Sequence, residues 1–343
     1  MKSENKHFVH DRSLPQSLRS LIRIAMPFLD IYYTILLMIS RNRSKEKKKE
    51  HKYYLSVCVI FRDEELSLQE WIEYHLLIGV DHFYMYNNLS TDNFQPILQP
   101  YIQSGIIDLI EWPVQSPSQF SAYEDCYGKY REDSQWIAFI DIDEYICPYY
   151  KVSIKDWIKG YEQYSSIVMY WKMFGTSGLL EHDMSKLVAE QYIGCWDKFY
   201  DVGKVIFNTN FEVYKFSEHH VMSAKVKILK HVLSIPPINE FKNFIRYKCN
   251  RIGMFRTTED FTIQINHYWS KSYDQYFIDK VLRGDPAAKP KQSTIRTVDA
   301  FFWHEHHNKA CDYKIWRFLI ELKIRMGKAR QIQEKIKMAH ESS

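Results

Sequence analysis

Short apolar segments alternate with amphipathic segments between residues 53 and 146, and this alternation limits the folds open to the chain. Strands joined through helices predict a mostly parallel sheet with helices on both faces. The expected strands are 53–61, 81–88, 106–113 and 136–146, and the expected helices are 67–79, 91–105 and 118–133. We therefore predict the α/β class, with a Rossmann-like, mostly parallel twisted sheet flanked by helices and with helical N- and C-terminal appendages.

Three of the expected strands end in polar residues, namely "RDEE" (62–65), "NNLSTD" (87–92) and "DIDE" (141–144). Ligands of open α/β sheets bind outside the carboxyl ends of the strands, so we expect one crevice there. The chain has no GxGxxG after its first strand and no GxxxxGK[ST] at all. A dinucleotide-binding Rossmann site and a P-loop are therefore not expected.

The acidic stretch "DIDE" predicts a divalent cation. Alternate residues of a strand share a face, so Asp141 and Asp143 are expected to converge on one site. Two neighbouring carboxylates repel unless a cation neutralises them, and oxygen ligands suit Mg²⁺ or Mn²⁺. Glu144 points the other way and is expected to brace the loop. A glycosidase pair fits less well, because it needs carboxyls on opposite sides of the scissile bond.

Charge and cysteine content bound the partners and the compartment. The net charge of +4 is too small to indicate nucleic-acid binding, and we predict none. The six cysteines are widely spaced without a CxxC pair, unlike a zinc ribbon or a disulfide scaffold. Reduced thiols fit a cytoplasmic protein, so we predict that location.

The two ends of the chain suggest contact with a membrane surface. Residues 24–40 are apolar but interrupted by Pro27 and Asp30, and the basic run 41–52 follows. A spanning helix needs about 20 apolar residues, so we expect this segment to lie on a membrane or to dock on the body, and a true span is the third interpretation. Residues 313–337 predict a basic amphipathic helix, which suits anionic lipid or a solvated position on the core. Peripheral contact with the inner face of a membrane is thus one of the open interpretations.

Several blocks together resemble glycosyltransferase family 92, whose members are GT-A-fold enzymes. They include "VIFRDEELSLQEWIEYHLLIGVDHFYMYNNLSTDN", "QFSAYEDCYGKYREDSQWIAFIDIDEYICP", "FGTSG" (174–178) and "INHYWSKSYDQYFIDKVLRG" (265–284). The resemblance covers about residues 53–290 as one GT-A domain. It leaves 1–52 as an amphipathic, basic N-terminal segment and 291–343 as a basic helical C-terminal region.

The resemblance implies a set of residues that contact a nucleotide-sugar donor. Arg62 and Glu64 stand where the family has a lysine and a glutamate, and they would border the nucleotide pocket. Asp92 would contact the base or the ribose. The remaining residues would lie beside the sugar-nucleotide and its diphosphate: Gln119, Tyr123, Asp141, Lys271 and Ser272.

The resemblance also implies a metal site and an acceptor-activating base. Asp141 and Asp143 would hold Mn²⁺ or Mg²⁺ on the diphosphate, with His267 as a third ligand and with His219 and His220 as rivals for that role. The family resembles inverting transferases, in which a carboxylate deprotonates the acceptor hydroxyl. The candidate bases that follow "FGTSG" are Glu190, Glu181 and Asp183, of which Glu190 best matches the family block.

The predicted function is a metal-dependent transfer of a hexose from a nucleotide-sugar, expected to be a UDP-sugar. The acceptor would be a glycan or a lipid-linked molecule, with inversion at the anomeric carbon. Two alternatives stay open. One is a non-catalytic, membrane-associated scaffold with a degenerate transferase fold, and the other is a metal-dependent phosphohydrolase.

Overall fold

The computed structural model describes residues 8–9, 16–45, 50–115, 118–216, 222–245, 261–282, 297–327 and 338. The rival histidines His219 and His220 lie outside these residues, as do positions 328–337 of the expected C-terminal helix.

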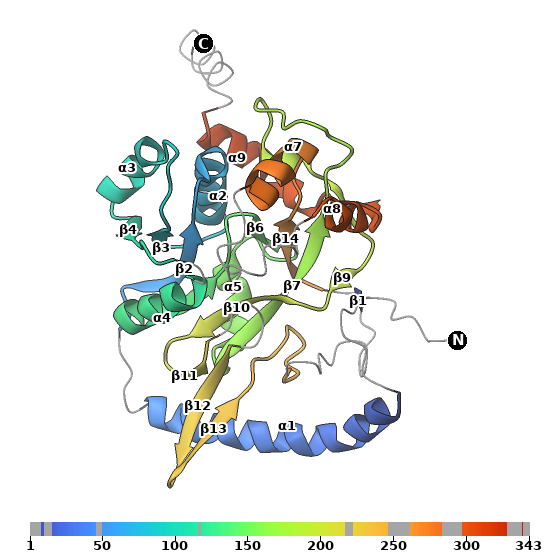
Figure 1. Ribbon diagram of the computed structural model, residues 1–343. Helices are drawn as coiled ribbons and strands as arrows, with labels where there is room; N and C mark the ends of the chain where they lie inside the picture. The colour runs from blue at the N-terminus through green and yellow to red at the C-terminus, as the bar shows by residue number, and fades with distance from the viewer. Residues whose placement is uncertain are drawn as a thin grey trace.

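The predicted α/β series is confirmed. The parallel part of the sheet has the spatial order β4-β3-β2-β5 (Figure 1). Along the chain, one helix lies between each of these strands and the one that follows it. The elements are β2 (Tyr53–Phe61), α2 (Glu65–Leu77), β3 (His82–Asn87), α3 (Gln95–Gln103), β4 (Ile107–Glu111), α4 (Gln119–Tyr130) and β5 (Ser134–Phe139). All of these strands therefore deliver their carboxyl ends to one edge of the sheet.

The expected single strand over 136–146 is wrong, because two strands share this stretch. β5 ends at Phe139, a tight turn follows, and β6 (Glu144–Pro148) begins at the last acid. The backbone N–H of Glu144 donates to the carbonyl of Asp141 over 3.1 Å and closes the turn. Asp141 and Asp143 therefore lie in a turn between strands and not on one strand face.

The sheet continues beyond β5 with antiparallel strands. β10 pairs with β5 and with β7, and β8 and β15 extend the same edge. β14 pairs in parallel with β7 and in antiparallel fashion with β6. The bounds are β7 (Ser166–Phe174), β8 (Gly194–Trp196), β10 (Gly203–Asn208), β14 (Ile263–Tyr268) and β15 (Asn308–Cys311).

Further short elements surround this sheet. They are β1 (Phe8–Val9), α5 (Ile154–Ile158), a 3-10 helix (Lys159–Tyr161), α6 (Val188–Gln191), β9 (Phe199–Tyr200), α7 (Tyr273–Tyr276), a π-helical segment (Phe277–Leu282), α8 (Val298–Glu305), a 3-10 helix (Lys314–Phe318) and α9 (Leu319–Arg325). A separate antiparallel sheet contains β11 (Glu212–Lys215), β12 (Ser223–Ile228) and β13 (His231–Ile235).

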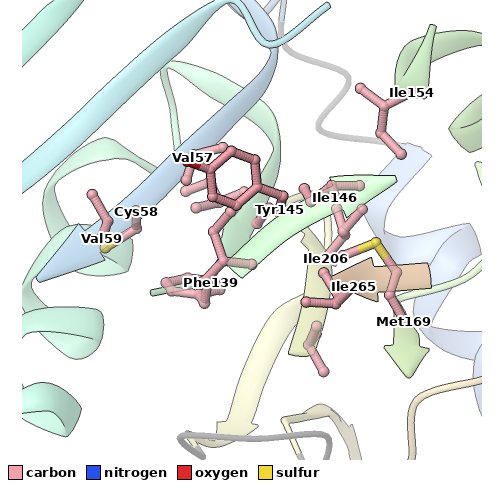
Figure 2. Packing of buried hydrophobic residues seen from close by; sticks show 14 of the residues in the cluster. Val57, Cys58, Val59, Phe139, Tyr145, Ile146, Ile154, Met169, Ile206 and Ile265 are labelled. Carbon is pink, nitrogen blue, oxygen red and sulfur yellow. The ribbon is translucent and has the colours of Figure 1, made fainter. Parts of the chain in front are cut away.

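The core forms where the parallel and antiparallel parts of the sheet meet. Figure 2 shows Val57 of β2 and Phe139 of β5 near Tyr145 of β6, with Ile265 of β14 in the same apolar cluster. Helix α2 is fastened to β6 by a hydrogen bond from Trp71 Nε1 to the carbonyl of Glu144 over 2.8 Å. Packing and hydrogen bonding therefore hold the turn before β6 in one position.

Helix α1 (Gln16–Lys45) packs by one face against β12 and β13, so the structure shows one of the two positions expected for residues 24–40, the one docked on the body. Among the described residues, one window of 18, Ile24–Arg41, is also long and apolar enough to cross a membrane, with a mean hydropathy of 1.3. Length and composition alone give this result, and membrane contact stays a prediction.

Glu240 predicts a pH dependence of folding. It is buried beside the start of β14, where its Oε2 accepts hydrogen bonds from the N–H and the hydroxyl of Thr262 over 2.7 Å each. Burial raises the pKa of Glu240 from 4.5 to about 7, although the bonds from Thr262 oppose the shift.

Between about pH 4.5 and pH 7 the folded state thus holds a proton that the unfolded state releases. The free energy of unfolding should therefore fall as pH rises through this window, by up to roughly 3 kcal/mol. Chemical denaturation at a series of pH values measures this slope. Glu240→Gln keeps an oxygen for Thr262 and should remove the contribution, whereas an unchanged slope in this variant would contradict the assignment.

Candidate active site

Asp141 follows β5 and directs its carboxylate toward the first turns of α4. Gln119 Nε2 donates a hydrogen bond to Asp141 Oδ1 over 2.7 Å, and the Tyr123 hydroxyl donates to the same oxygen over 3.3 Å. Gln119 and Tyr123 are four residues apart and so lie on one side of the helix. The structure therefore brings together three of the residues predicted to contact the sugar-nucleotide.

A buried lysine of β10 neutralises the turn from the other side. Lys204 is 1% exposed, and its Nζ lies 2.8 Å from Asp141 Oδ2 and 3.7 Å from Glu144 Oε2. Burial alone would lower the pKa of Lys204, but Asp141 and Glu144 raise it above its ordinary value. The lysine is therefore charged, and it was not predicted from the sequence.

Glu144 supports the turn from inside. Its side chain is fully buried, and its Oε2 accepts a hydrogen bond from the backbone N–H of Asp141 over 2.9 Å. Burial raises the pKa of Glu144 well above its ordinary range, and the charge on Lys204 opposes the shift only in part. The prediction that Glu144 braces the loop is confirmed.

Asp143 takes a different set of partners. Lys280 of the π-helical segment forms an ion pair with Asp143 Oδ2, and His267 Nε2 lies 3.6 Å from the same oxygen. Burial alone would raise the pKa of Asp143, but Lys280 and His267 hold it well below its usual range. Burial also lowers the pKa of His267, so a carboxylate faces a neutral imidazole at pH 7.

The pairing of β14 explains how His267 reaches this turn. In register, His267 lies opposite Glu144 of β6 on one side and opposite Met173 of β7 on the other. The N–H of Tyr268 then donates to the carbonyl of Asp143 over 2.8 Å. Residues more than a hundred positions apart in the sequence thus form one site.

Asp143 and His267 are the residues present that suit a divalent ion. An ionised carboxylate and a neutral imidazole are both ligands of Mn²⁺, and His267 Nδ1 is buried without a hydrogen-bond partner. Asp141, the third predicted ligand, instead gives both oxygens to Lys204, Gln119 and Tyr123. Within the described part of the chain, no three His, Cys, Asp or Glu side chains form a cluster able to hold a metal.

A narrow cleft, too tight in this structure to admit a water molecule, lies next to Asp143, at the carboxyl end of β14. Its lining residues are Glu64, Asp143, Tyr268, Trp269, Ser270, Lys271, Gln275, Asp279 and Lys280. Lys271 Nζ lies 2.9 Å from the Ser67 hydroxyl oxygen, 3.7 Å from Glu64 and 3.6 Å from Asp279. The backbone of Lys271 has φ +49°, a conformation that non-glycine residues rarely adopt and that tends to occur at functional sites.

The loops after β2 and β3 join the same edge. Arg62 donates to the carbonyl of Asn88 over 2.8 Å and to its side-chain oxygen over 2.6 Å. The Ser118 hydroxyl, next to Gln119, donates to the same side-chain oxygen of Asn88 over 3.2 Å. Asn88 thereby links Arg62 to the start of α4, the helix whose Gln119 and Tyr123 donate hydrogen bonds to Asp141.

Asp92 and Ser272 are two further residues predicted to contact the nucleotide-sugar. In the structure both form hydrogen bonds to other residues of the chain. Asp92 Oδ2 accepts from the backbone N–H of Glu65 over 2.7 Å, while its Oδ1 is buried without a partner. Burial raises the pKa of Asp92 above its ordinary value. The Ser272 hydroxyl donates to Asp274 at the start of α7. Asp92 lies in the loop after β3, and Ser272 follows β14 directly before α7.

The three candidate bases follow the loop after β7. Glu190 pairs with Lys323 of α9 and also accepts the N–H of Leu187 at the start of α6 over 3.4 Å. Asp183 accepts hydrogen bonds from the backbone N–H and hydroxyl of Ser185. Glu181 is exposed. Their catalytic roles stay predictions.

The same loop contains a histidine that the sequence did not single out. His182 Nδ1 lies 2.7 Å from the Tyr192 hydroxyl, and burial together with the charge of Lys271 lowers the pKa of His182. The carbonyl of Leu179 accepts the N–H of Tyr273 over 3.2 Å, which places this loop beside α7. His182 is therefore a neutral imidazole close to the cleft.

In the stretch "WHEHH" (303–307), His304 stacks on Trp269 with ring centroids 4.6 Å apart. Its neighbour Glu305 does more than pack. Glu305 accepts hydrogen bonds from the Thr176 hydroxyl over 2.8 Å and from the Ser270 hydroxyl over 3.1 Å. One carboxylate thus joins the "FGTSG" loop to the end of β14.

Residues 51–281 match the family model described as glycosyltransferase family 92. The chain belongs to this family. The matched region agrees in extent with the GT-A domain expected over 53–290, and it contains Asp141, Asp143 and His267.

Curated family 92 proteins are similar over part of the chain. A glycosyltransferase family 92 protein of rice, Oryza sativa subsp. japonica, is 34% identical over 101 residues, which cover 29% of this chain and 17% of that protein. A galactan beta-1,4-galactosyltransferase of Arabidopsis thaliana is 25% identical over 138 residues, covering 37% and 27%. The chain thus spans well under a third of the length of these relatives.

Solved structures of glycosyltransferases are also similar, with low TM-scores. The Staphylococcus aureus TarS fragment 1–349 has 11% identity and a TM-score of 0.31, covering 46% of the family 92 chain and 47% of its own. Glucosyl-3-phosphoglycerate synthase from Mycobacterium tuberculosis has 14% identity and a TM-score of 0.29, covering 48% and 61%. Scores of this size carry no argument about the site, which depends on the contacts above.

Lys204→Met tests whether this lysine holds the acidic turn of the family 92 chain. Removing one member of a buried charge cluster leaves Asp141 and Glu144 uncompensated, and we expect a loss of about 3–5 kcal/mol in the free energy of unfolding. Adding Glu144→Gln should restore part of that loss, because the two residues are coupled.

Denaturant unfolding of the single and double variants measures both effects. Lys129→Met removes a lysine from the exposed pair with Asp125 and should change stability little. Equal, small effects at Lys204 and Lys129 would contradict the role assigned to Lys204.

Proposed function

We propose that this chain is a metal-dependent glycosyltransferase that transfers a hexose from a nucleotide-sugar, a UDP-sugar, to a glycan or lipid-linked acceptor with inversion. The observation that carries the proposal is the acidic turn at the carboxyl edge of the sheet. There Asp141 bonds to Gln119 and Tyr123, while Asp143 faces His267. The family and the galactosyltransferase relative support a hexose as the group transferred.

Mn²⁺ or Mg²⁺ is the proposed cofactor, with Asp143 and His267 as its ligands. The position beside Asp143 already stabilises a cation, since Lys280 places its ammonium there. When bound, the ion would neutralise the negative charge that develops on the departing diphosphate. Asp141 suits contact with the donor better than metal binding, because its partners on α4 fix its orientation.

The other residues of the cleft would bind and orient the donor. Lys271 is an ammonium held 3.7 Å from Glu64 and 3.6 Å from Asp279, and such a group is a good partner for a phosphate oxygen. Ser272 begins α7 beside it. Gln119 and Tyr123 present a hydrogen-bonding pair next to Asp141, which suits the hydroxyl groups of a ribose or a sugar. Arg62, in the loop after β2, would border the nucleotide pocket, and Asp92, in the loop after β3, would contact the base or the ribose.

We place the reaction in the cytoplasm. Within the described residues the cysteines Cys58, Cys126, Cys147, Cys195 and Cys311 are free thiols. Free thiols are the ordinary state of cysteine in a reducing compartment.

Asp143→Asn tests the proposed metal and donor site. Release of UDP or GDP is measured with Mn²⁺ across common nucleotide-sugars, in the presence of a mixture of glycan acceptors. We expect the wild-type chain to use one UDP-sugar, and we expect Asp143→Asn to lower kcat/KM by roughly a hundredfold or more, because a charge acting on the leaving group is removed. Asp156→Asn, at an exposed ion pair with Lys159, is the matched control and should behave as wild type.

Three results would count against the proposal. Turnover that survives both Asp143→Asn and removal of divalent ions would contradict the metal site. Phosphate release without a sugar acceptor would favour a phosphohydrolase. A wild-type chain that neither turns over nor binds any nucleotide-sugar would favour a scaffold.

Glu190→Gln tests the assignment of the base. A glutamine keeps the hydrogen bond to the N–H of Leu187, so the start of α6 should survive. If Glu190 takes the proton of the acceptor hydroxyl, kcat should fall about 10²- to 10⁴-fold while donor binding is kept. Lys323→Met removes the ion-pair partner and should leave kcat largely intact. A normal kcat in Glu190→Gln would exclude this residue and leave Glu181 and Asp183 to test in the same way.

A further inference from the structure

Helix α1 is apolar on two opposite faces. One face is buried in the body through Met26, Tyr33, Leu36 and Leu37, and the Tyr33 ring lies 5.4 Å from that of Phe244. The opposite face carries a continuous exposed stripe at the spacing of helical turns, formed by Ile24 (73% exposed), Phe28, Ile31, Ile35 and Met38 (59% exposed). A helix that is apolar all round is normally covered on every side, by protein or by lipid. In the described chain the second side is open.

The hairpin beneath α1 adds an exposed leucine at its tip. Leu229 joins β12 to β13, is 87% exposed and has φ +53°. A bulky residue is strained in this conformation, and glycine or asparagine is the usual choice at such a turn. Figure 1 shows the tip extending past α1, away from the main sheet. A leucine that is both strained and exposed adds nothing to the stability of the fold. We therefore infer that its side chain makes a contact with something outside the chain.

Basic residues border these apolar groups. Arg41 is exposed at the end of the stripe, and Lys230 and His231 are exposed next to Leu229. The sequence from 41 to 52 contains seven Lys or Arg (positions 41, 43, 45, 47, 48, 49 and 52) and two Glu. Positive charge beside an apolar face is complementary to an anionic lipid surface.

We propose that the stripe of α1 and the tip residue Leu229 form a membrane-docking face that lies on a bilayer containing anionic phospholipid, with α1 parallel to the membrane plane. A second copy of the chain fits this face less well, because the same basic residues would then approach one another. A spanning position would require lipid around the whole helix, whereas the opposite side of α1 is packed on β12 and β13.

The docking face and the cleft lie at opposite ends of β7. Near its start, the Ser166 hydroxyl donates to the carbonyl of Met222 beside β12 over 3.2 Å. Beyond its end, Thr176 shares Glu305 with Ser270 of the cleft. The nine residues of β7 cover about 30 Å. If the proposed function holds, the acceptor end therefore reacts at some distance from the bilayer, which suits a growing glycan better than a headgroup at the membrane surface.

Vesicle flotation of the full chain tests the docking itself, without any measurement of activity. We expect the wild-type chain to float with vesicles of phosphatidylcholine and phosphatidylglycerol, less with phosphatidylcholine alone, and to be released by high salt. No binding to the anionic vesicles would overturn the proposal. Resistance to both high salt and alkaline carbonate would overturn it in favour of a spanning helix.

Variants separate docking from folding. Ile31→Gln with Ile35→Gln should weaken vesicle binding roughly tenfold or more, because two large side chains no longer enter the lipid. Leu229→Gly should weaken binding while keeping or raising the melting temperature, since glycine relieves the backbone strain. Ile320→Gln, at an exposed site on α9, is the matched control and should bind as wild type. Equal vesicle binding by all variants would overturn the proposal. So would a wild-type chain that does not bind vesicles but forms a dimer, if the double variant Ile31→Gln with Ile35→Gln is a monomer.

Discussion

The ammonium of Lys204 is the charge on which the acidic turn depends. Asp141 and Glu144 lie at the end of a buried strand, where isolated carboxylates would be costly. β10 runs between β5 and β7, and this places Lys204 within 2.8 Å of Asp141 and 3.7 Å of Glu144. With Asp141 paired to Lys204, the buried Glu144 accepts the backbone N–H of Asp141 and holds the turn. Asp141 is then presented to α4, and Asp143 to the cleft.

The second half of the site depends on β14. Its pairing with β6 and β7 carries His267 to Asp143, and the chain then continues directly into Lys271 and Ser272. Glu305 ties the end of this strand to the loop after β7, which contains His182, Glu181 and Asp183 and leads into α6 with Glu190. The pairing of β14 with β6 and β7 therefore brings the proposed metal ligands and the proposed diphosphate contacts together.

Local patterns in the sequence predicted the parallel half of the fold well, because each strand and helix there has its own periodicity and its own polar end. The alternation in "DIDE" suggested a continuing strand, yet the turn closed by Asp141 and Glu144 ended it. Lys204 was missed because its significance lies in its contact with Asp141, 63 positions away along the chain, which no local pattern reveals. The position of His267 came from the family resemblance, and only the structure shows why β14 brings it to Asp143. For α1 the pattern predicted an amphipathic segment on a membrane or on the body, but it did not show which face would dock and which would stay exposed.

The proposed divalent ion would lie on Asp143 and His267, next to the proposed nucleotide site. The most direct measurement is anomalous diffraction at the manganese edge from crystals of the chain grown with Mn²⁺ and UDP. We expect one strong peak bonded to a carboxylate oxygen of Asp143 and to a ring nitrogen of His267, with Lys280 moved away from Asp143 and UDP beside Asp141. A bound UDP without any manganese at Asp143, or manganese held elsewhere in the chain, would contradict it.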